Sequence, residues 1–288
     1  MATNKEIVDD LFGSDEEEDT NNSIDEKNND GNVINRPKAF GVCTFHTGIE
    51  EMMWQYVLEH APRNSPALIL QAIDQFCMSK HWMMHIGQDK AEVIVNAIRE
   101  TKQNKRALFL SETFIVVELG SYCGYSAVRI ASELENIGNE KLFCLELYEN
   151  CVGWTKRLVD YAGLSDRVTV IQTSAKEIEN WKPLLSEFTQ SSEPKINILF
   201  VDHDKKEYFH DLKKIVENNL LTSNSLVVAD NVLSFNSPKQ DYLDYVRDPN
   251  GPFRSSRLVE GFIEYCTEDE KRNDLAMMKD GIEISIFK

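Results

Sequence analysis

Apolar and polar positions form blocks of two lengths along residues 114–230. Short apolar runs of the length of buried strands lie near 114–119, 141–147, 167–172, 196–202 and 225–230. Longer segments with helical spacing lie between them, near 124–135, 149–162, 175–188 and 206–219. Regular alternation of strands and helices predicts an α/β domain around a mostly parallel sheet.

Further elements flank this block on both sides. Helical periodicity begins at Ile49 and continues through Ala67–Met78 and Lys90–Ile98, which predicts helices before the sheet. Two late apolar runs, Leu258–Tyr265 and Ile282–Phe287, flank a charged turn and should pair as an antiparallel hairpin. The pattern therefore predicts a Rossmann-like, seven-stranded, mostly parallel sheet with an antiparallel C-terminal hairpin.

The N-terminal segment has a different composition. Residues 1–36 contain eleven acids and three bases, a net charge of −8 out of the formal −17. Such a segment is too polar to fold alone, so we expect a disordered acidic tail at 1–40 and one folded domain at 41–288. Leu11 and Phe12, framed by acids, could dock in a basic groove of a protein partner, although a solvated tail is the commoner explanation.

Charge and cysteine usage exclude several classes of protein. A body this acidic should bind neither nucleic acid phosphates nor anionic membranes. No run approaches the roughly 18 apolar residues of a membrane helix, and the acidic N-terminus is unlike a signal peptide. The six cysteines show no paired spacing, which indicates a reducing compartment. We expect a soluble cytoplasmic protein, with the nucleus as the alternative.

Two apolar runs end in side chains suited to a metal. The run from Ile198 ends at Asp202, with Lys205 three residues on, and the run from Ser225 ends at Asp230 and Asn231. The carboxyl edge of such a sheet is where ligands bind, and carboxylate and amide oxygens suit Mg²⁺. Lys205 is then placed to deprotonate a group that the metal holds. The alternative, acids that merely cap the following helices, is weaker when two strands end this way.

A glycine turn follows the first strand of the block. Gly120 and Gly124 lie between that strand and a helical pattern, as in nucleotide-binding loops. Glu118 stands where a dinucleotide fold has its first glycine, so the loop suits a cationic cofactor without pyrophosphate, such as S-adenosylmethionine. Glu146 ends the next strand, roughly the 20 residues on at which an acid binds ribose hydroxyls.

These segments resemble the Mg²⁺-dependent catechol O-methyltransferases. The similarity runs from about Trp54 to Lys288 and is strongest in five motifs. They are Trp82–Lys90, Glu118–Arg129, Asp202–Lys205, Ala229–Val232 and Phe262–Tyr265. The resemblance implies a class I methyltransferase fold, a catalytic domain at 41–288, a monomer, and, given the tail, a fungal- or protist-like member of the family.

The resemblance also implies a role for each site residue. Asp202, Asp230 and Asn231 would bind Mg²⁺, which chelates the catechol, and Lys205 would be the general base. The acceptor would contact Lys205, Asn231, Glu264, which holds its second hydroxyl, and Trp82 at the pocket rim. The methyl donor would contact Met84, Ile86, Glu118, Gly120, Tyr122, Ser126, Glu146, Asp202 and His203, the last against the adenine. For His203, Met84 and Glu264 the alternatives are a structural histidine, an apolar filler and an exposed strand acid.

The chain departs from the family pattern near the expected acceptor pocket. Asp204 replaces a bulky aromatic residue, Phe235 replaces a proline, and Ala175-Lys176 replaces a Ser-Gln pair. None of these changes touches the expected metal ligands or base, so the reaction is expected to persist. Catecholamine specificity does not follow, although Asp204 at the pocket mouth would favour cationic acceptors.

Two other functions are compatible with parts of the sequence. A nicotinamide oxidoreductase could use a related sheet, but Glu118 in place of the first glycine argues against it. A pseudoenzyme that recruits partners through its tail has no need for Asp202, Lys205, Asp230 and Asn231 together. NAD binding and a methyl-transfer assay would separate these alternatives.

Overall fold

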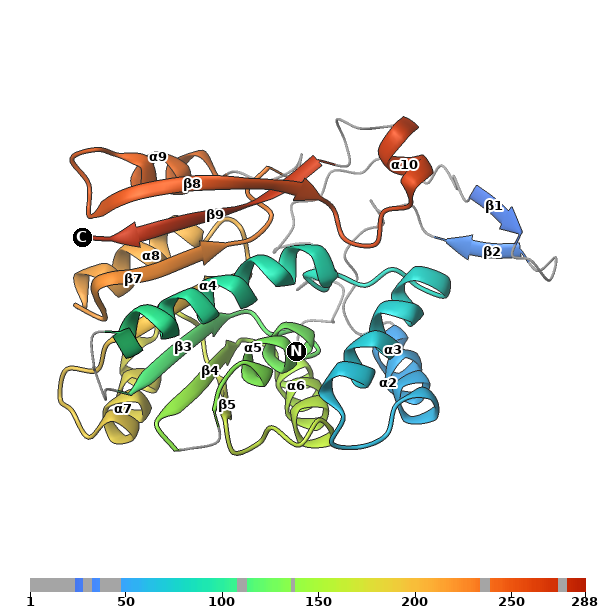
Figure 1. The fold of residues 1–288 in the computed structure, drawn as a ribbon, viewed down its shortest axis with the longest axis horizontal. Helices are drawn as coiled ribbons and strands as arrows, with labels where there is room; N and C mark the ends of the chain where they lie inside the picture. The colour runs from blue at the N-terminus through green and yellow to red at the C-terminus, as the bar shows by residue number, and fades with distance from the viewer. Residues whose placement is uncertain are drawn as a thin grey trace, which may run out of the picture.

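The computed structural model describes residues 24–27, 33–36, 48–107, 113–135, 138–233, 239–273 and 279–288. Its centre is a seven-stranded sheet in the order β5-β4-β3-β6-β7-β9-β8 (Figure 1). Neighbouring strands run parallel except at β9, which is antiparallel to both β7 and β8. The strands are β3 Phe114–Leu119, β4 Glu140–Glu146, β5 Val168–Gln172, β6 Ile196–Val201, β7 Leu221–Ala229, β8 Phe253–Phe262 and β9 Lys279–Phe287.

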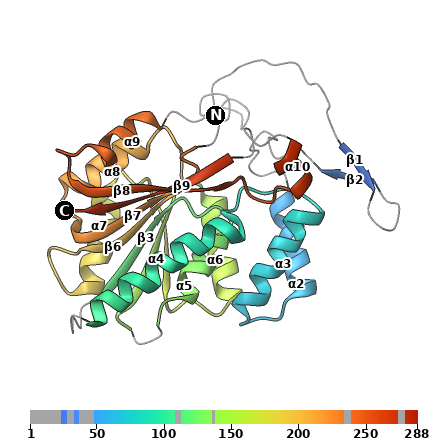
Figure 2. The same ribbon diagram turned by 45° about the horizontal axis from the view of Figure 1, so that its top comes forward.

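Helices cover both faces of the sheet (Figure 2). One face packs against α2 Ile49–His60, α3 Pro66–Ser79, α4 Gly87–Ala107, α5 Tyr125–Ser132 and α6 Glu149–Tyr161. The other face packs against α7 Ile178–Thr189, α8 Tyr208–Glu217 and α9 Gln240–Arg247. Strand β3 shows why two cores form, because Val116 faces the first and Val117 the second. A short helix, α10 Glu268–Asn273, follows β8.

The predicted fold class is confirmed, including the antiparallel pairing of the last two strands. Several boundaries differ from the predicted ranges, and those of β8 affect the site. Strand β8 begins at Phe253, five residues before the predicted start. The apolar pattern does not reveal this start because the first half of the strand is polar. It ends at Phe262, so Glu264 lies in the following turn and not on a strand. Helix α9 was not predicted, although Tyr242, Leu243 and Val246 form its buried stripe.

The expected tail contains two short strands. Strands β1 Ile24–Lys27 and β2 Val33–Arg36 pair antiparallel in a sheet of their own, where the sequence predicts disorder. Backbone pairing needs no apolar side chains, which is why composition does not reveal it. Leu11, Phe12 and Phe235 lie outside the described residues. The division at residue 40 stays a prediction.

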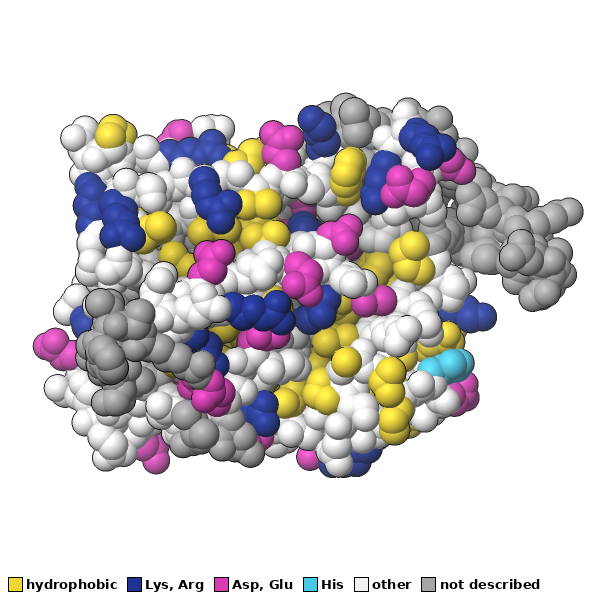
Figure 3. All heavy atoms as spheres, in the orientation of Figure 1, with side chains coloured by type: hydrophobic (Ala, Val, Ile, Leu, Met, Phe, Trp, Pro, Cys, Tyr) yellow, Lys and Arg dark blue, Asp and Glu magenta, His cyan; other side chains and the backbone are white. Residues whose placement is uncertain are grey.

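The charged surface, the polarity of the helices and the state of the cysteines can be compared with the composition. Figure 3 shows Lys and Arg side chains interspersed with Asp and Glu on the face it presents. Within the described part of the chain, every helix is too short or too polar to span a membrane. The five cysteines described there are free and buried.

Candidate active site

The carboxyl ends of β3, β6 and β7 meet at one edge of the sheet, and backbone hydrogen bonds fix their relative positions. The Asp202 amide donates to the Leu119 carbonyl oxygen at 3.0 Å, and the Asp230 amide donates to that of Val201 at 3.0 Å. Gly120 has a φ of +85°, and a Cβ atom on it would lie 2.5 Å from the Asp202 carbonyl oxygen. Only glycine allows the loop after β3 to approach β6 this closely.

Three buried carboxylates converge at this edge. Oxygen atoms of Asp230, Glu264 and Asp280 lie within 4.8 Å of one another. The Lys90 ammonium lies among them, 2.9 Å from Asp230 and 2.7 Å from Asp280, and it also contacts Glu264. The Asn231 side-chain amide donates to Asp280 at 2.7 Å and to Glu264 at 3.2 Å. We call these five residues the acidic cluster.

Burial and charge act in opposite directions within the acidic cluster. Burial raises the pKa of Asp230 to about 8 although Lys90 opposes it, and burial also raises the pKa of Glu264. Burial also acts to raise the pKa of Asp280, but the charge of Lys90 and hydrogen bonds from Lys90, Asn231 and the Gly281 backbone together outweigh it, and the pKa falls. Burial lowers the pKa of Lys90, but three carboxylates outweigh it and hold the ammonium charged. The cluster therefore contains more carboxylates than its one lysine can neutralise.

The arrangement suits a divalent cation. Asp230 Oδ1 is buried and accepts no hydrogen bond from the described residues, although the Lys90 ammonium lies 2.9 Å away. With Asp202 there are four carboxylates against Lys90 and Lys205. Burial and Lys205 lower the pKa of nearby Lys239 to about 7, so it supplies only part of a further charge at neutral pH. With all four carboxylates ionised, the group is short of one to two positive charges, and buried oxygen ligands of this kind suit Mg²⁺.

Lys205 connects two of the strand ends. Its ammonium donates to Asp202 Oδ1 and to the Tyr208 hydroxyl, both at 2.8 Å. The fully buried Tyr208 hydroxyl donates in turn to the Asp230 carbonyl oxygen at 3.2 Å. Asp202 is thus paired with Lys205 and stands outside the close group of three acids, although its charge raises the pKa of Asp230.

Two acids, Glu118 of β3 and Glu146 of β4, lie at the loop after β3. Glu146 accepts hydrogen bonds from the Ser121 and Tyr122 amides, both at 3.0 Å. Glu118 is completely buried and accepts hydrogen bonds from the Cys144 thiol at 3.0 Å and from Ser126. Burial raises the pKa of Glu118 to about 7. Glu146, the acid expected to bind the ribose, therefore lies at this loop, and its carboxylate is hydrogen-bonded to the loop backbone.

Tyr122 in the loop after β3 and His203 in the loop after β6 form contacts with neighbouring helices. Tyr122, with a φ of +45°, donates its hydroxyl to Glu50 of α2 at 3.2 Å. His203 bonds to Asp211 of α8 at 2.9 Å and stacks on Tyr208, with ring centroids 5.2 Å apart. These contacts hold His203 against α8. Its expected position against the adenine stays a prediction.

The segment before α4 packs on the turn after β8. The Trp82 indole donates to the Glu264 carbonyl oxygen at 3.1 Å, and a Cβ atom on Gly87 would lie 3.3 Å from the Glu264 Cβ. Met84 is half-buried and Ile86 is buried in the same segment. The structure thus brings together Trp82 and Glu264, both expected to contact the acceptor.

Asp204 lies in the loop after β6. Its carboxylate accepts a hydrogen bond from the Lys206 amide at 3.0 Å. After burial and Glu146, its charge is the next influence that raises the pKa of Tyr148, in the loop after β4. The expected position of Asp204 at the acceptor pocket mouth stays a prediction.

Comparison with known proteins identifies the family. The model of the O-methyltransferase family matches residues 70–282. The catechol O-methyltransferase of Bos taurus is 31% identical over 239 residues, which cover 83% of this chain and 76% of that protein. The chain belongs to the catechol O-methyltransferase family. This makes it an S-adenosylmethionine-dependent O-methyltransferase.

Other relatives of this methyltransferase agree. Catechol O-methyltransferase B of Danio rerio is 30% identical, over 80% of this chain and 76% of that protein. A probable O-methyltransferase of Mycobacterium tuberculosis is also 30% identical, over 76% and 88%. An SAH-bound methyltransferase from Podospora anserina has a TM-score of 0.53 at 15% identity, covering 86% of this chain and 99% of that one. That likeness supports the class I fold alone.

Three residues of the methyltransferase site were missed by sequence reasoning. Lys90 precedes Ile94 and Ile98 by four and eight residues, so it shares their buried stripe, an unusual place for a lysine. Asp280 is the second residue of β9, and the start of an antiparallel strand lies where the parallel strands end. Tyr208 gave no signal beyond an aromatic residue at a helix start.

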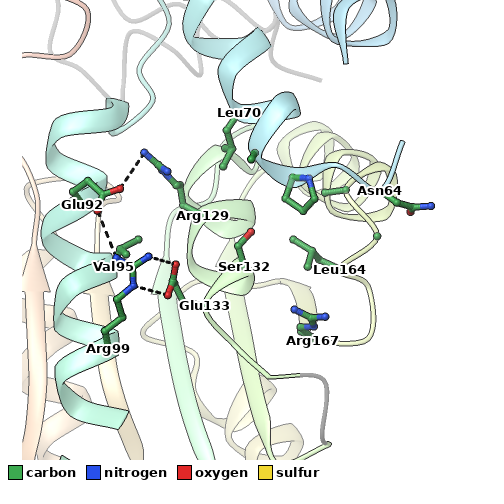
Figure 4. A pocket seen from close by; sticks show the side chains of 14 residues that line it. Asn64, Leu70, Glu92, Val95, Arg99, Arg129, Ser132, Glu133, Leu164 and Arg167 are labelled. Carbon is green, nitrogen blue, oxygen red and sulfur yellow. Dashed lines mark hydrogen bonds and ion pairs between the residues drawn. The ribbon is translucent and has the colours of Figure 1, made fainter. Parts of the chain in front are cut away.

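The cavity in Figure 4 is separate from this site. Its volume is about 510 Å³, and its lining comes from α3, α4, α5 and the segments before α3 and β5, with none of the predicted site residues. Arg99 of α4 donates to Glu133 at 2.8 and 2.7 Å, and Arg129 of α5 pairs with Glu92 at 3.6 Å. These pairs fasten α4 to the neighbouring α5 segment, and α4 carries Lys90.

Proposed function

We propose that this methyltransferase transfers the methyl group of S-adenosylmethionine to one hydroxyl of a catechol held with Mg²⁺. The single observation that supports this most is the acidic cluster, which is short of positive charge and lies beside Lys205 at the ligand-binding edge of the sheet. Family membership supplies the reaction, and this geometry supports the metal and the vicinal diol.

Asp202, Asp230 and Asn231 would hold the metal. Their carboxylate and amide oxygens are hard ligands, and Asp230 Oδ1 accepts no hydrogen bond from the described residues. A bound Mg²⁺ favours the ionised form of a hydroxyl, as it does for bound water. The Asn231 amide nitrogen is held by Asp280 and Glu264, which fixes the orientation of the whole amide group.

Lys205, as the neutral amine left after its ammonium has released a proton to solvent, would accept the proton of the hydroxyl that is methylated. The ammonium that results is stabilised by the contacts that the structure already contains, with Asp202 and the Tyr208 hydroxyl. Glu264 would accept a hydrogen bond from the second hydroxyl, because Lys90 and Asn231 hold its carboxylate at the cluster. The two contacts would select which oxygen faces the methyl donor.

The loop after β3 would orient the donor. Glu118 and Glu146 would bind its methionine and ribose parts, with Gly120, Tyr122 and Ser126 in the same loop. Met84, Ile86 and His203 would supply apolar and aromatic contacts. Holding two reactants in line is worth several orders of magnitude in rate, so orientation is the main contribution of these residues.

An acceptor series tests this proposal. We expect methyl transfer from labelled S-adenosylmethionine to catechol, and at least about 10²-fold lower kcat/KM with phenol, because a site built to bind a hydroxyl rejects an analogue without it. Glu264→Gln should reduce this discrimination. Equal kcat/KM for catechol and phenol would contradict a site for vicinal diols.

A further inference from the structure

Lys90 is a buried cation with three carboxylate partners from three different elements. Only 4% of its side chain is exposed. Its partners are Asp230 at the end of β7, Glu264 in the turn after β8 and Asp280 at the start of β9. An ammonium has three protons, so this set uses its full donor capacity.

We propose that Lys90 is a positioning residue for the divalent cation site, with Asp280 as its anchor. The inference rests on the proposed function and adds two residues to it. Neither residue is among the expected metal ligands. Both act through Asp230 and Asn231, which are.

The position of Lys90 is fixed by its helix. It lies in the first turn of α4, which Arg99 binds to Glu133 after α5 at 2.7 Å. Ala91, the next residue, and Ile94, one helical turn further on, are completely buried in the core. Lys90 therefore stays in the cluster when a metal enters, and the metal shares the acids with it.

The contacts show how Lys90 and Asp280 would position the ligands. The Lys90 ammonium lies 2.9 Å from both oxygens of Asp230; it donates a hydrogen bond to Oδ2, while Oδ1 accepts no hydrogen bond from described residues. A carboxylate oxygen has two lone pairs, so Oδ1 can still bind a metal while Lys90 fixes the carboxylate. Asp280 accepts from both Lys90 and the Asn231 amide nitrogen, which ties the second ligand to the same anchor.

Loss of Lys90 would release this arrangement. Carboxylates within 4.8 Å of one another repel strongly in a buried site, and without the ammonium they would turn apart. Asp230 would then lose its fixed orientation. Loss of a residue that orients a metal ligand commonly lowers metal affinity by 10–100-fold.

Binding of Mn²⁺ to the full-length protein, without methyl donor or acceptor, tests the inference. The amount of free Mn²⁺ is followed by electron paramagnetic resonance in the unsubstituted protein and in Lys90→Met. We expect the dissociation constant to rise at least about tenfold. Lys102→Met is the matched control, because Lys102 belongs to the same helix and also loses an ion pair, with Glu140. Its dissociation constant should stay within about twofold of the unsubstituted value.

A charge-balanced double variant separates the positioning role of Lys90 from its effect on the net charge of the cluster. It also guards against misfolding caused by unpaired buried acids. Lys90→Met with Asp280→Asn removes one positive and one negative charge and leaves fewer unpaired acids. We expect weakened Mn²⁺ binding here too, by at least about tenfold. Binding as tight as in the unsubstituted protein, in either Lys90 variant, would overturn the inference alone. No Mn²⁺ binding by the unsubstituted protein would overturn the metal in the proposed function and the inference with it.

Discussion

Lys205 has the contacts expected of a residue that accepts and holds a proton. Its nitrogen atom lies 2.8 Å from both Asp202 Oδ1 and the Tyr208 hydroxyl, and the Tyr208 hydroxyl bonds to the backbone beside the acidic cluster. The side chain is therefore held by two partners between the ends of β6 and β7. Its role in the reaction can be separated from donor binding by mutation.

Lys205→Ala should lower kcat by roughly 10²–10⁴-fold, the usual contribution of a general base, with little change in S-adenosylmethionine affinity. Steady-state kinetics and calorimetric binding of the donor measure the two effects. Lys206→Ala removes an exposed neighbouring lysine and should leave kcat unchanged. A Lys205→Ala enzyme with normal kcat at neutral pH would assign the base elsewhere.

Glu118 should make stability depend on pH. Burial raises its pKa from about 4.5 to about 7, so the folded protein retains a proton that the unfolded chain would release. Its contribution to stability is complete below pH 4.5 and is lost as pH rises through 7. Between pH 4.5 and 7 the free energy of unfolding should therefore fall more in the unsubstituted protein than in Glu118→Gln. Parallel denaturation curves across that interval would contradict the raised pKa.

At the scale of elements, β9 joins the C-terminal hairpin to the parallel sheet. Glu283 of β9 is completely buried and is bound bidentately by Arg247 of α9, at 2.8 and 2.6 Å. It also accepts a hydrogen bond from Ser256 of β8. Glu283 thus links α9, β8 and β9, and its carboxylate depends on Arg247 for charge compensation.

Arg247→Ala should lower the free energy of unfolding by about 2 kcal/mol, because a buried carboxylate loses two charge-assisted hydrogen bonds. Denaturant unfolding measures the change. Lys279→Ala removes an exposed ion pair with Glu260 on the same hairpin, 3.8 Å long, and should cost less than about 0.5 kcal/mol. Similar losses in the two variants would show that burial of Glu283 does not matter.

The sequence predicts the site residues at the ends of parallel strands better than those that reach the site from other elements. Asp202, Asp230 and Asn231 follow apolar runs directly, so their common edge can be inferred from the pattern alone. Lys90 and Asp280 reach the same edge from a helix start and from an antiparallel strand start, which no local period indicates. Glu264 was identified by resemblance but placed on a strand, because the turn at Tyr265, with a φ of +59°, has no glycine to mark it.

At the scale of the whole molecule, the described strands of the acidic tail form a sheet separate from the seven-stranded sheet. These two strands pair only with each other (Figure 1). We predict that a chain of residues 41–288 keeps kcat/KM for catechol within about twofold of the full chain, since all the expected site residues lie beyond Ser79. A larger loss in steady-state kinetics would show that the tail contributes to the catalytic domain.

The most direct test of the whole account is the metal dependence of methyl transfer to catechol. The acidic cluster with Asp202 is short of positive charge, and Asp230 Oδ1 accepts no hydrogen bond from the described residues. Transfer from labelled S-adenosylmethionine should fall to background in excess chelator and return when Mg²⁺ is added beyond the chelator. Full activity in excess chelator would contradict the proposed mechanism.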